Sequence, residues 1–107
     1  MNSKEGKILV DGGALQKEMT YEKLSSIEDY EGSRCIIVNT MDPDLFLVFG
    51  KIDVIISRQG SKLSHLAILA REYGKTLILA DCTDENIAKK GNLKIIKEDE
   101  KARIEFS

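Results

Sequence analysis

The stretch DVIISRQGSKLSHLAILAREYGKTLILA, residues 53–80, contains the clearest indication of the fold. Its ends, residues 53–57 and 76–80, are short apolar runs without alternation, which is typical of strands buried on both faces. Residues 64–73 between them predict a helix that Gly74 ends. This helix is apolar nearly all round, so we expect it to be buried. A strand, a helix and a strand in this order form a βαβ unit, whose crossover gives parallel pairing.

The sequence upstream of this unit predicts two more strands and one short helix. Residues 34–39 form another apolar run typical of a buried strand, and residues 7–10 predict a short strand. Asp42 and Pro43 favour a helix start, because an aspartate side chain caps free N–H groups and proline suits the first helical position. The polar stretch 15–29 predicts no definite element.

The sequence downstream predicts a second short helical stretch over residues 84–90. Residues 93–97 and 102–106 then alternate around a polar turn, which predicts a closing β-hairpin. The chain, residues 1–107, is long enough for one hydrophobic core, so we expect a single domain. The predicted fold class is α/β, with a central, largely parallel sheet, flanking helices and a C-terminal β-hairpin.

Composition excludes several classes of protein. Hydrophobic residues make up 42% and charged residues 32%, which is typical of a globular domain, and the formal net charge is −2. Such a charge gives no basic footprint for nucleic acid or for an anionic membrane. No signal-peptide core follows Met1, and no apolar run approaches the roughly 20 residues of a membrane span. We therefore expect a cytoplasmic protein in which Cys35 and Cys82 are reduced, partly buried thiols.

His65 is the single histidine, and its place at the start of the predicted helix makes it the candidate for chemistry. The first helical turn has unpaired N–H groups and a partial positive charge of about half a unit. This field favours a bound anion and disfavours imidazolium, so we expect a neutral, nucleophilic ring. Attack of that ring on phosphorus gives N-phosphohistidine, whose charge Arg58 or Lys62 can compensate. Gly60 lets the backbone come close.

Two other interpretations of His65 stay open from the residues alone. A histidine at a helix start is often a polar cap or a surface residue without a chemical role. A metal site that combines His65 with Cys82 or Asp81 is the other alternative, although these residues lack the spacing of a metal-ligand motif.

The string GSKLSHLAILAREYG, residues 60–74, resembles the phosphorylation-site signature G-G-x-[TL]-[ST]-H-x-A-I-x-A-R-x-x-G of the phosphoenolpyruvate-utilising enzymes. NTMDPDL, residues 39–45, resembles the T-x-P-D segment of the same family, and KGNLKI, residues 90–95, resembles its closing D-G-x-x-V-x-V. These matches follow the family's order within residues 34–106. The resemblance implies the mobile phosphohistidine domain of the phosphoenolpyruvate synthase and pyruvate phosphate dikinase family, a swivelling β/β/α domain.

The resemblance implies a role for each matching residue. His65 would accept a phosphoryl group at one active site and deliver it at another. Phosphate binding would fall to Gly60, Ser61, Ser64 and Arg71, and Arg71 would also brace the helix or its loop. The implied partners are an ATP-grasp nucleotide-binding protein, a barrel that binds phosphoenolpyruvate, or both. The chain has no P-loop, so we expect Mg²⁺ to be bound through these partners and no cofactor by this chain alone.

The chain departs from the signature close to the histidine. Ser61 replaces the second glycine, Leu63 stands where part of the family has threonine, and Leu66 is larger than the usual residue. The leading hypothesis is a stand-alone phosphohistidine carrier of a synthase-like or dikinase-like phosphotransferase. The departures keep two alternatives open. One is a non-catalytic regulatory or binding module in which His65 caps the helix. The other is a small subunit of another enzyme that retains the swivelling fold.

Overall fold

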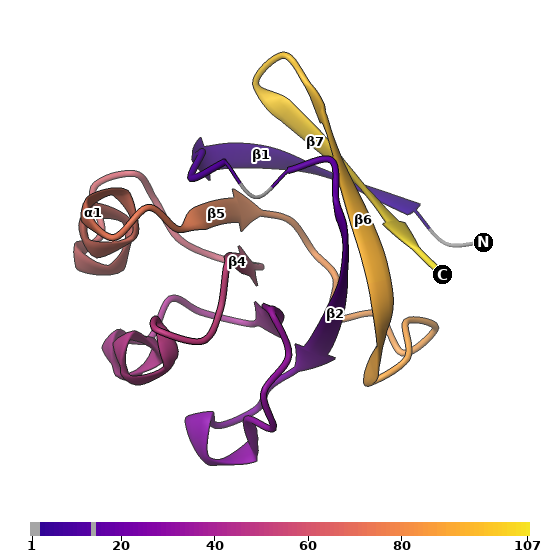
Figure 1. Ribbon diagram of the computed structural model, residues 1–107, viewed down its shortest axis with the longest axis horizontal. Helices are drawn as coiled ribbons and strands as arrows, with labels where there is room; N and C mark the ends of the chain where they lie inside the picture. Colours follow the sequence, from indigo (N-terminus) through magenta and orange to yellow (C-terminus); the bar gives the residue numbers. More distant parts are fainter. Residues whose placement is uncertain (1–2, 14) are drawn as a thin grey trace.

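The computed structural model describes residues 3–13 and 15–107, and over these residues the chain forms a closed β-barrel (Figure 1). Seven strands within the described part of the chain close in the order β1-β5-β4-β3-β2-β6-β7. Their bounds are β1 Ser3–Val10, β2 Glu18–Lys23, β3 Cys35–Val38, β4 Val54–Ser57, β5 Thr76–Leu79, β6 Lys90–Glu98 and β7 Lys101–Phe106.

Short helical segments lie outside the barrel. They are the 3₁₀ helices η1, Ile27–Asp29, and η2, Pro43–Val48, and the α-helix α1, His65–Glu72. Figure 1 shows α1 and η2 on the same side of the barrel, and α1 packs against η2, β1 and β5. No helix among the described residues is both long enough and apolar enough to span a bilayer.

The barrel wall has a parallel part and an antiparallel part. Strands β2, β3, β4 and β5 pair in parallel, and β1, β6 and β7 close the wall with antiparallel ladders. The βαβ unit is confirmed, because β4 and β5 pair in parallel with Val54 opposite Thr76. The closing β-hairpin is also confirmed, with Leu93 of β6 opposite Phe106 of β7.

The predicted fold class, an α/β domain with flanking helices around a largely parallel sheet, is wrong. The sheet closes on itself because β2 pairs with β6, and β1 pairs with both β5 and β7. The prediction missed β2, which lies in the polar stretch 15–29. It also began β1 at residue 7, four residues after its actual start at Ser3. Without these two segments an open sheet remains, and an open sheet needs helices on both faces.

The predicted helix over residues 84–90 is wrong as well. This segment forms turns, in which Asp84 accepts from Asn86 N through its side chain and from Ile87 N through its carbonyl. Lys23 Nζ donates to the carbonyls of Asp84 and Ile87, at 2.8 Å each. The Asp84 side chain and Lys23 Nζ thus form hydrogen bonds with backbone groups that a helix would pair within itself.

Two buried layers explain why the strands read as unbroken apolar runs. The barrel interior contains one buried cluster, which includes Met19, Tyr21, Cys35, Ile37, Val54, Ile56, Ile78, Leu93, Ile95, Ile104 and Phe106. A second cluster lies between the barrel wall and the helices and includes Ile36, Val38, Leu45, Phe49, Ile52, Ile55, Leu66, Ala67, Ala70 and Leu77. Alternate residues of β3, β4 and β5 therefore enter different apolar layers, and both faces are buried.

The expectation that α1 is buried all round is wrong. Leu66, Ala67 and Ala70 are buried against the barrel, whereas Ile68 is 42% exposed. The interior is already filled by strand side chains, so α1 lies on the outer wall and covers it with one face only.

Candidate functional site

The loops that follow β3 and β4 run side by side at the carboxyl edge of the parallel strands. Arg58 N donates to the carbonyl of Val38 at 3.0 Å, and Gln59 N donates to that of Asn39 at 3.1 Å. The second loop, residues 58–64, leads directly into α1, whose first residue is His65. The histidine therefore lies next to the edge at which many folds with parallel strands bind ligands.

Ser64 fixes the start of α1. Its backbone is extended (φ −67°, ψ 152°), and its Oγ accepts from Ala67 N at 3.2 Å. The same hydroxyl donates to the Ser61 carbonyl at 2.9 Å. The N-cap of the helix is thus Ser64, which fills the role that the regulatory alternative gave to His65. The N–H groups of His65 and Leu66 have no hydrogen-bond partner among the described residues, so they are free to face an anion.

Ser61 holds the loop in a tight turn before the helix. Its carbonyl accepts from Ser64 N at 3.3 Å, and its Oγ accepts from Leu63 N at the same distance. The turn brings Ser61 and Ser64 together immediately before the exposed side chain of His65. Ser61 therefore performs a structural task at a position where the family signature has glycine.

Gly60 lies against Met41, which belongs to the segment that resembles T-x-P-D. A Cβ atom at position 60 would overlap Met41 Cε, and Gly60 has φ +151°. Met41 Sδ also lies 3.8 Å from Ser64 Oγ. Met41 thereby connects the two signature segments. The sequence analysis marked its segment but not this residue, because a methionine between polar residues carries no functional signal of its own.

Ser57 is a second residue that the sequence analysis missed. It is the last residue of β4, it is fully buried, and its hydroxyl donates to the Gln59 carbonyl at 2.6 Å. This bond fixes the direction in which the loop leaves the strand. A serine at the end of an apolar run is a weak sign of a structural role. Because the Ser57 hydroxyl is buried, it needs a hydrogen-bond partner within the protein.

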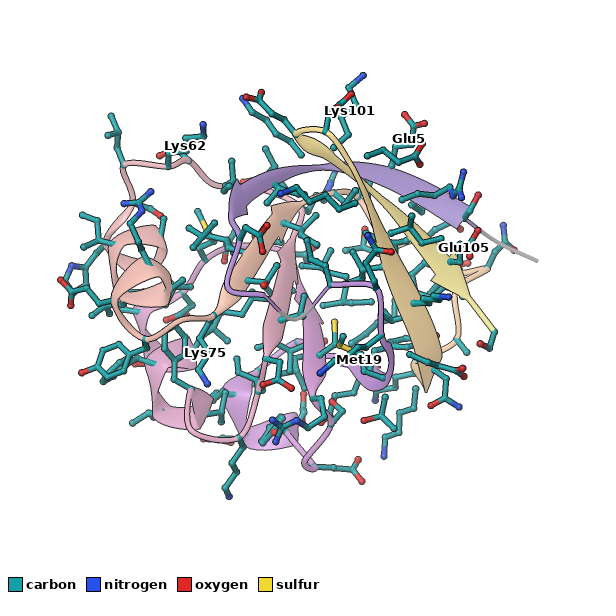
Figure 2. All side chains as sticks on the ribbon, turned by 45° about the horizontal axis from the view of Figure 1, so that its top comes forward. Glu5, Met19, Lys62, Lys75, Lys101 and Glu105 are labelled. Carbon is teal, nitrogen blue, oxygen red and sulfur yellow. The ribbon has the colours of Figure 1, made fainter. Side chains whose placement is uncertain are left out.

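The basic residues around the histidine differ in position. Arg58 Nε lies 3.7 Å from Asp81 Oδ2, and Lys62 is exposed on the loop before α1 (Figure 2). Hydrogen bonds from the Thr83 hydroxyl and N–H lower the pKa of Asp81, and the nearby Arg58 adds to this effect. Arg71 lies in the last turn of α1, six residues beyond His65 or about 9 Å along the axis. The structure thus groups Gly60, Ser61 and Ser64 with His65 and places Arg71 at the other end of the helix.

The thiols lie away from the histidine surface. Cys35 and Cys82 are both buried and free, which confirms that they are buried thiols. Burial raises the pKa of Cys82 to about 12 and raises the pKa of Cys35 as well. Such thiols are protonated at neutral pH and are poor nucleophiles and ligands. No group of three or more metal-ligating side chains occurs within residues 3–13 and 15–107.

A hollow of about 190 Å³ opens at the same edge of the barrel. Its wall is formed by residues 24–27, 38–40 and 42 together with Asp44 and Leu45. His65 is not part of this wall and lies on open surface. Chemistry at His65 therefore needs a second surface to position the donor and to exclude water.

Two comparisons with known proteins show which family the chain resembles. The family described as "PEP-utilising enzyme, mobile domain" matches residues 31–100. Over 70 residues the chain is 33% identical to the phosphoenolpyruvate synthase of Synechocystis sp. (strain ATCC 27184 / PCC 6803 / Kazusa). The aligned part covers 64% of this chain and 9% of that synthase, so the chain matches one short segment of a much longer enzyme.

Proposed function

The chain belongs to the family of mobile domains of phosphoenolpyruvate-utilising enzymes, and on that premise we propose that it is a phosphohistidine carrier. In this proposal His65 accepts a phosphoryl group at one active site and releases it at another. Both sites lie outside residues 1–107.

One observation carries the proposal. His65 is the first residue of α1 and is exposed, and the N–H groups beside it are unpaired among the described residues. Ser64 and Ser61 hold the turn before it with their own hydrogen bonds, so the imidazole is not needed for structure. An exposed histidine next to free N–H groups suits a site that must hold phosphate and still meet a second protein.

The proposed step is an in-line displacement at phosphorus. The lone pair of one ring nitrogen of His65 forms the N–P bond while the bond from phosphorus to the bridging oxygen of the donor breaks. That oxygen leaves with the bonding electron pair, and the proton on the second ring nitrogen is retained or passes to water. Delivery is the reverse displacement, in which an acceptor oxygen attacks phosphorus and the ring nitrogen recovers its lone pair.

Charge compensation favours the phosphorylated state of this surface. The new phosphoryl group adds negative charge beside the helix N-terminus, whose free N–H groups stabilise anions. Lys62 is exposed three residues before His65 and makes no ion pair with another described residue. Arg58, held near Asp81, is the second nearby cation. Together these two cations supply part of the positive charge that a bound phosphoryl group needs.

Mg²⁺ belongs to the partners in this proposal. Among the described residues no group of three or more ligating side chains occurs. The proposed donor is an ATP-grasp protein or a barrel that binds phosphoenolpyruvate, and such a partner would hold Mg²⁺ together with the phosphates. The family to which the chain belongs supports this choice of partners.

Phosphorylation of the purified chain tests the proposal. The chain is incubated with Mg²⁺ and either phosphoenolpyruvate or ATP in an extract of the cells that make it, then analysed by intact mass. We expect an acid-labile, base-stable phosphoryl adduct in the wild type and none in His65→Ala or His65→Gln. Because His65 is exposed, both variants keep the fold, and Lys101→Gln on the distant hairpin is the matched control. No adduct with either donor, in folded protein, would exclude the carrier.

A further inference from the structure

The large hydrophobic side chains exposed by the described residues belong to η2 and to residues 63–73 around α1, two elements that lie on the same side of the barrel (Figure 1). They are Phe46 (38% exposed), Leu47 (77%), Leu63 (89%), Ile68 (42%) and Tyr73 (55%). Single exposed apolar residues are ordinary in soluble proteins, but a gathered set marks an interaction site. We refer to these five residues as the apolar face.

Ring packing joins two residues of the apolar face, Phe46 and Tyr73. The Phe46 ring lies 5.1 Å from the Tyr73 ring, which joins η2 to the end of α1. Phe49 lies beneath both, at 5.1 Å from Phe46 and 6.3 Å from Tyr73. At the other end, Leu63 is two residues before His65. A protein that covers Leu63 therefore also reaches the histidine.

The charges around the apolar face differ in sign from the charge of the whole chain. The chain has a formal net charge of −2, whereas residues 43–51 and 62–75 together carry four basic and two acidic side chains. The basic residues are Lys51, Lys62, Arg71 and Lys75, and none makes an ion pair with another described residue. Figure 2 shows Lys62 and Lys75 on the helix side, away from Lys101 at the hairpin. A matching partner surface is therefore apolar with an acidic rim.

The size of the apolar face favours a transient contact over a stable dimer. Five partly exposed side chains present apolar surface on the order of several hundred Å². A stable interface needs ~800 Å² on each partner, whereas weak and transient contacts lie below that size. A carrier that serves two sites in turn requires release after each transfer, so a small contact area suits the proposed function.

We propose that the apolar face is the docking surface for the protein that phosphorylates His65, and that this partner has an apolar contact surface with an acidic rim. The inference rests on the proposed function and adds to it the surface and the chemistry of the partner. Docking there would cover Leu63 and the open side of His65 together, which supplies the exclusion of water that the chain alone lacks.

The test separates docking from the chemistry of the histidine. Leu47→Ser and Leu63→Ser, singly and combined, remove exposed side chains and leave the core intact. Each variant is phosphorylated in two ways: by phosphoramidate, a small donor that needs no docking, and by the donor that labels the wild type in the cell extract. In the extract, the initial rate is measured against the concentration of the chain, which gives the half-saturating concentration.

We expect the combined variant to raise the half-saturating concentration in the extract by about tenfold or more, with an unchanged rate from phosphoramidate. Lys51→Glu with Lys75→Glu should also raise the half-saturating concentration. Lys94→Glu with Lys101→Glu, which changes the charge by the same amount on the hairpin, should not.

An unchanged half-saturating concentration in the leucine variants would overturn the docking surface and leave the carrier intact. A wild-type dimer that Leu47→Ser dissociates would also overturn it, because the face would then bind a second copy. A wild type that phosphoramidate labels and the extract does not would overturn the carrier, and the docking surface with it.

Discussion

At the scale of single residues, the position of His65 depends on Ser64 more than on any contact of its own. The Ser64 hydroxyl accepts from Ala67 N and donates to the Ser61 carbonyl, so it links the helix start to the loop. The family resemblance predicted both Ser64 and Ser61 as phosphate ligands, and in the structure both side chains form hydrogen bonds within the turn. Because the Ser64 side chain accepts from Ala67 N, the N–H groups of His65 and Leu66 have no partner among the described residues.

Replacement of Ser64 separates stability from transfer. Ser64→Ala removes the cap and should lower the free energy of unfolding by about 1 kcal/mol, measured by urea denaturation. Ser64→Asp restores a capping oxygen and should recover that stability, but its carboxylate repels the incoming phosphoryl group and should slow phosphorylation of His65. Equal phosphorylation rates in wild type and Ser64→Asp would contradict a phosphoryl site at this helix start.

Glu22 is a buried carboxylate that organises the loop between β2 and β3. It is 3% exposed, and it accepts from the N–H groups of Glu31, Gly32 and Ser33 at 3.0–3.1 Å and from the Ser33 hydroxyl at 2.8 Å. Burial alone would raise the pKa of Glu22, but these hydrogen bonds outweigh it and lower the pKa below its ordinary value of 4.5. The charged form therefore stabilises the fold above pH 4.5, and this contribution is lost as the pH falls through the lowered pKa.

The stability effect of a Glu22 variant should depend on pH, whereas that of a surface control should not. Glu22→Gln should lower the free energy of unfolding by about 1–3 kcal/mol at pH 7, because a neutral amide cannot accept every bond that the carboxylate does. The difference from wild type should shrink as the pH falls below 4.5, where the wild type loses its own carboxylate. Glu18→Gln, at an exposed position of the same strand, should have little effect at either pH. A constant difference between pH 7 and pH 3 would show that the charge of Glu22 contributes nothing.

At the scale of elements, the contact between two loops sets the orientation of α1. Gly60 and Met41 lie against each other, and Met41 Sδ lies 3.8 Å from the Ser64 Oγ. The loop after β3 thus supports the loop that carries the histidine.

A double-mutant cycle measures this support. Gly60→Ala should destabilise the fold by about 1 kcal/mol or more, because alanine is strained at φ +151° and its Cβ overlaps Met41. Adding Met41→Ala removes the overlap and should recover part of that loss, so the two changes should be non-additive in urea denaturation. Additive effects on the free energy of unfolding would mean that backbone strain alone explains the need for glycine at position 60.

The sequence predicted the elements near the histidine well and those that close the barrel poorly. Unbroken apolar runs identified β3, β4 and β5, and a serine followed by an apolar stretch identified α1. Strand β2 escaped because its alternation is too short: only Met19 and Tyr21 are apolar among its six residues, and the buried Glu22 interrupts the pattern. Glu22 is buried because the loop at residues 31–33 hydrogen-bonds to its carboxylate. That loop lies outside the strand, so the local periodicity of β2 does not predict the burial of Glu22.

At the scale of the whole molecule, closure is a long-range property that short patterns do not contain. Gly91 of β6 and Tyr21 of β2 lie opposite each other, and the Tyr21 ring packs edge-on to Phe106 at 5.2 Å. These contacts join the parallel half of the wall to the C-terminal hairpin across some 70 residues of sequence. The grouping of Gly60, Ser61 and Ser64 before His65 follows from a signature that is local in sequence, whereas Arg71 lies at the other end of the helix. The phosphate-binding roles of these residues stay predictions.

The closed barrel bears on the proposed need for other proteins. The described strands fill its interior with apolar side chains, which leaves the outer surface for binding. The histidine follows the loop at the carboxyl edge and does not line the hollow beside Thr40 and Asp42. In the proposed carrier, other proteins would complete the active site around this exposed residue.

A pulse-chase measurement tests most directly whether His65 carries phosphoryl groups or only receives them. The chain is labelled on His65 with a radioactive phosphoryl donor, isolated, and returned to fresh extract with unlabelled donor and pyruvate. We predict that the label leaves the protein at the rate at which the extract phosphorylates unlabelled chain and enters a small phosphorylated product. Label that stays on His65, or that leaves only as inorganic phosphate at the rate seen in buffer, would contradict the carrier.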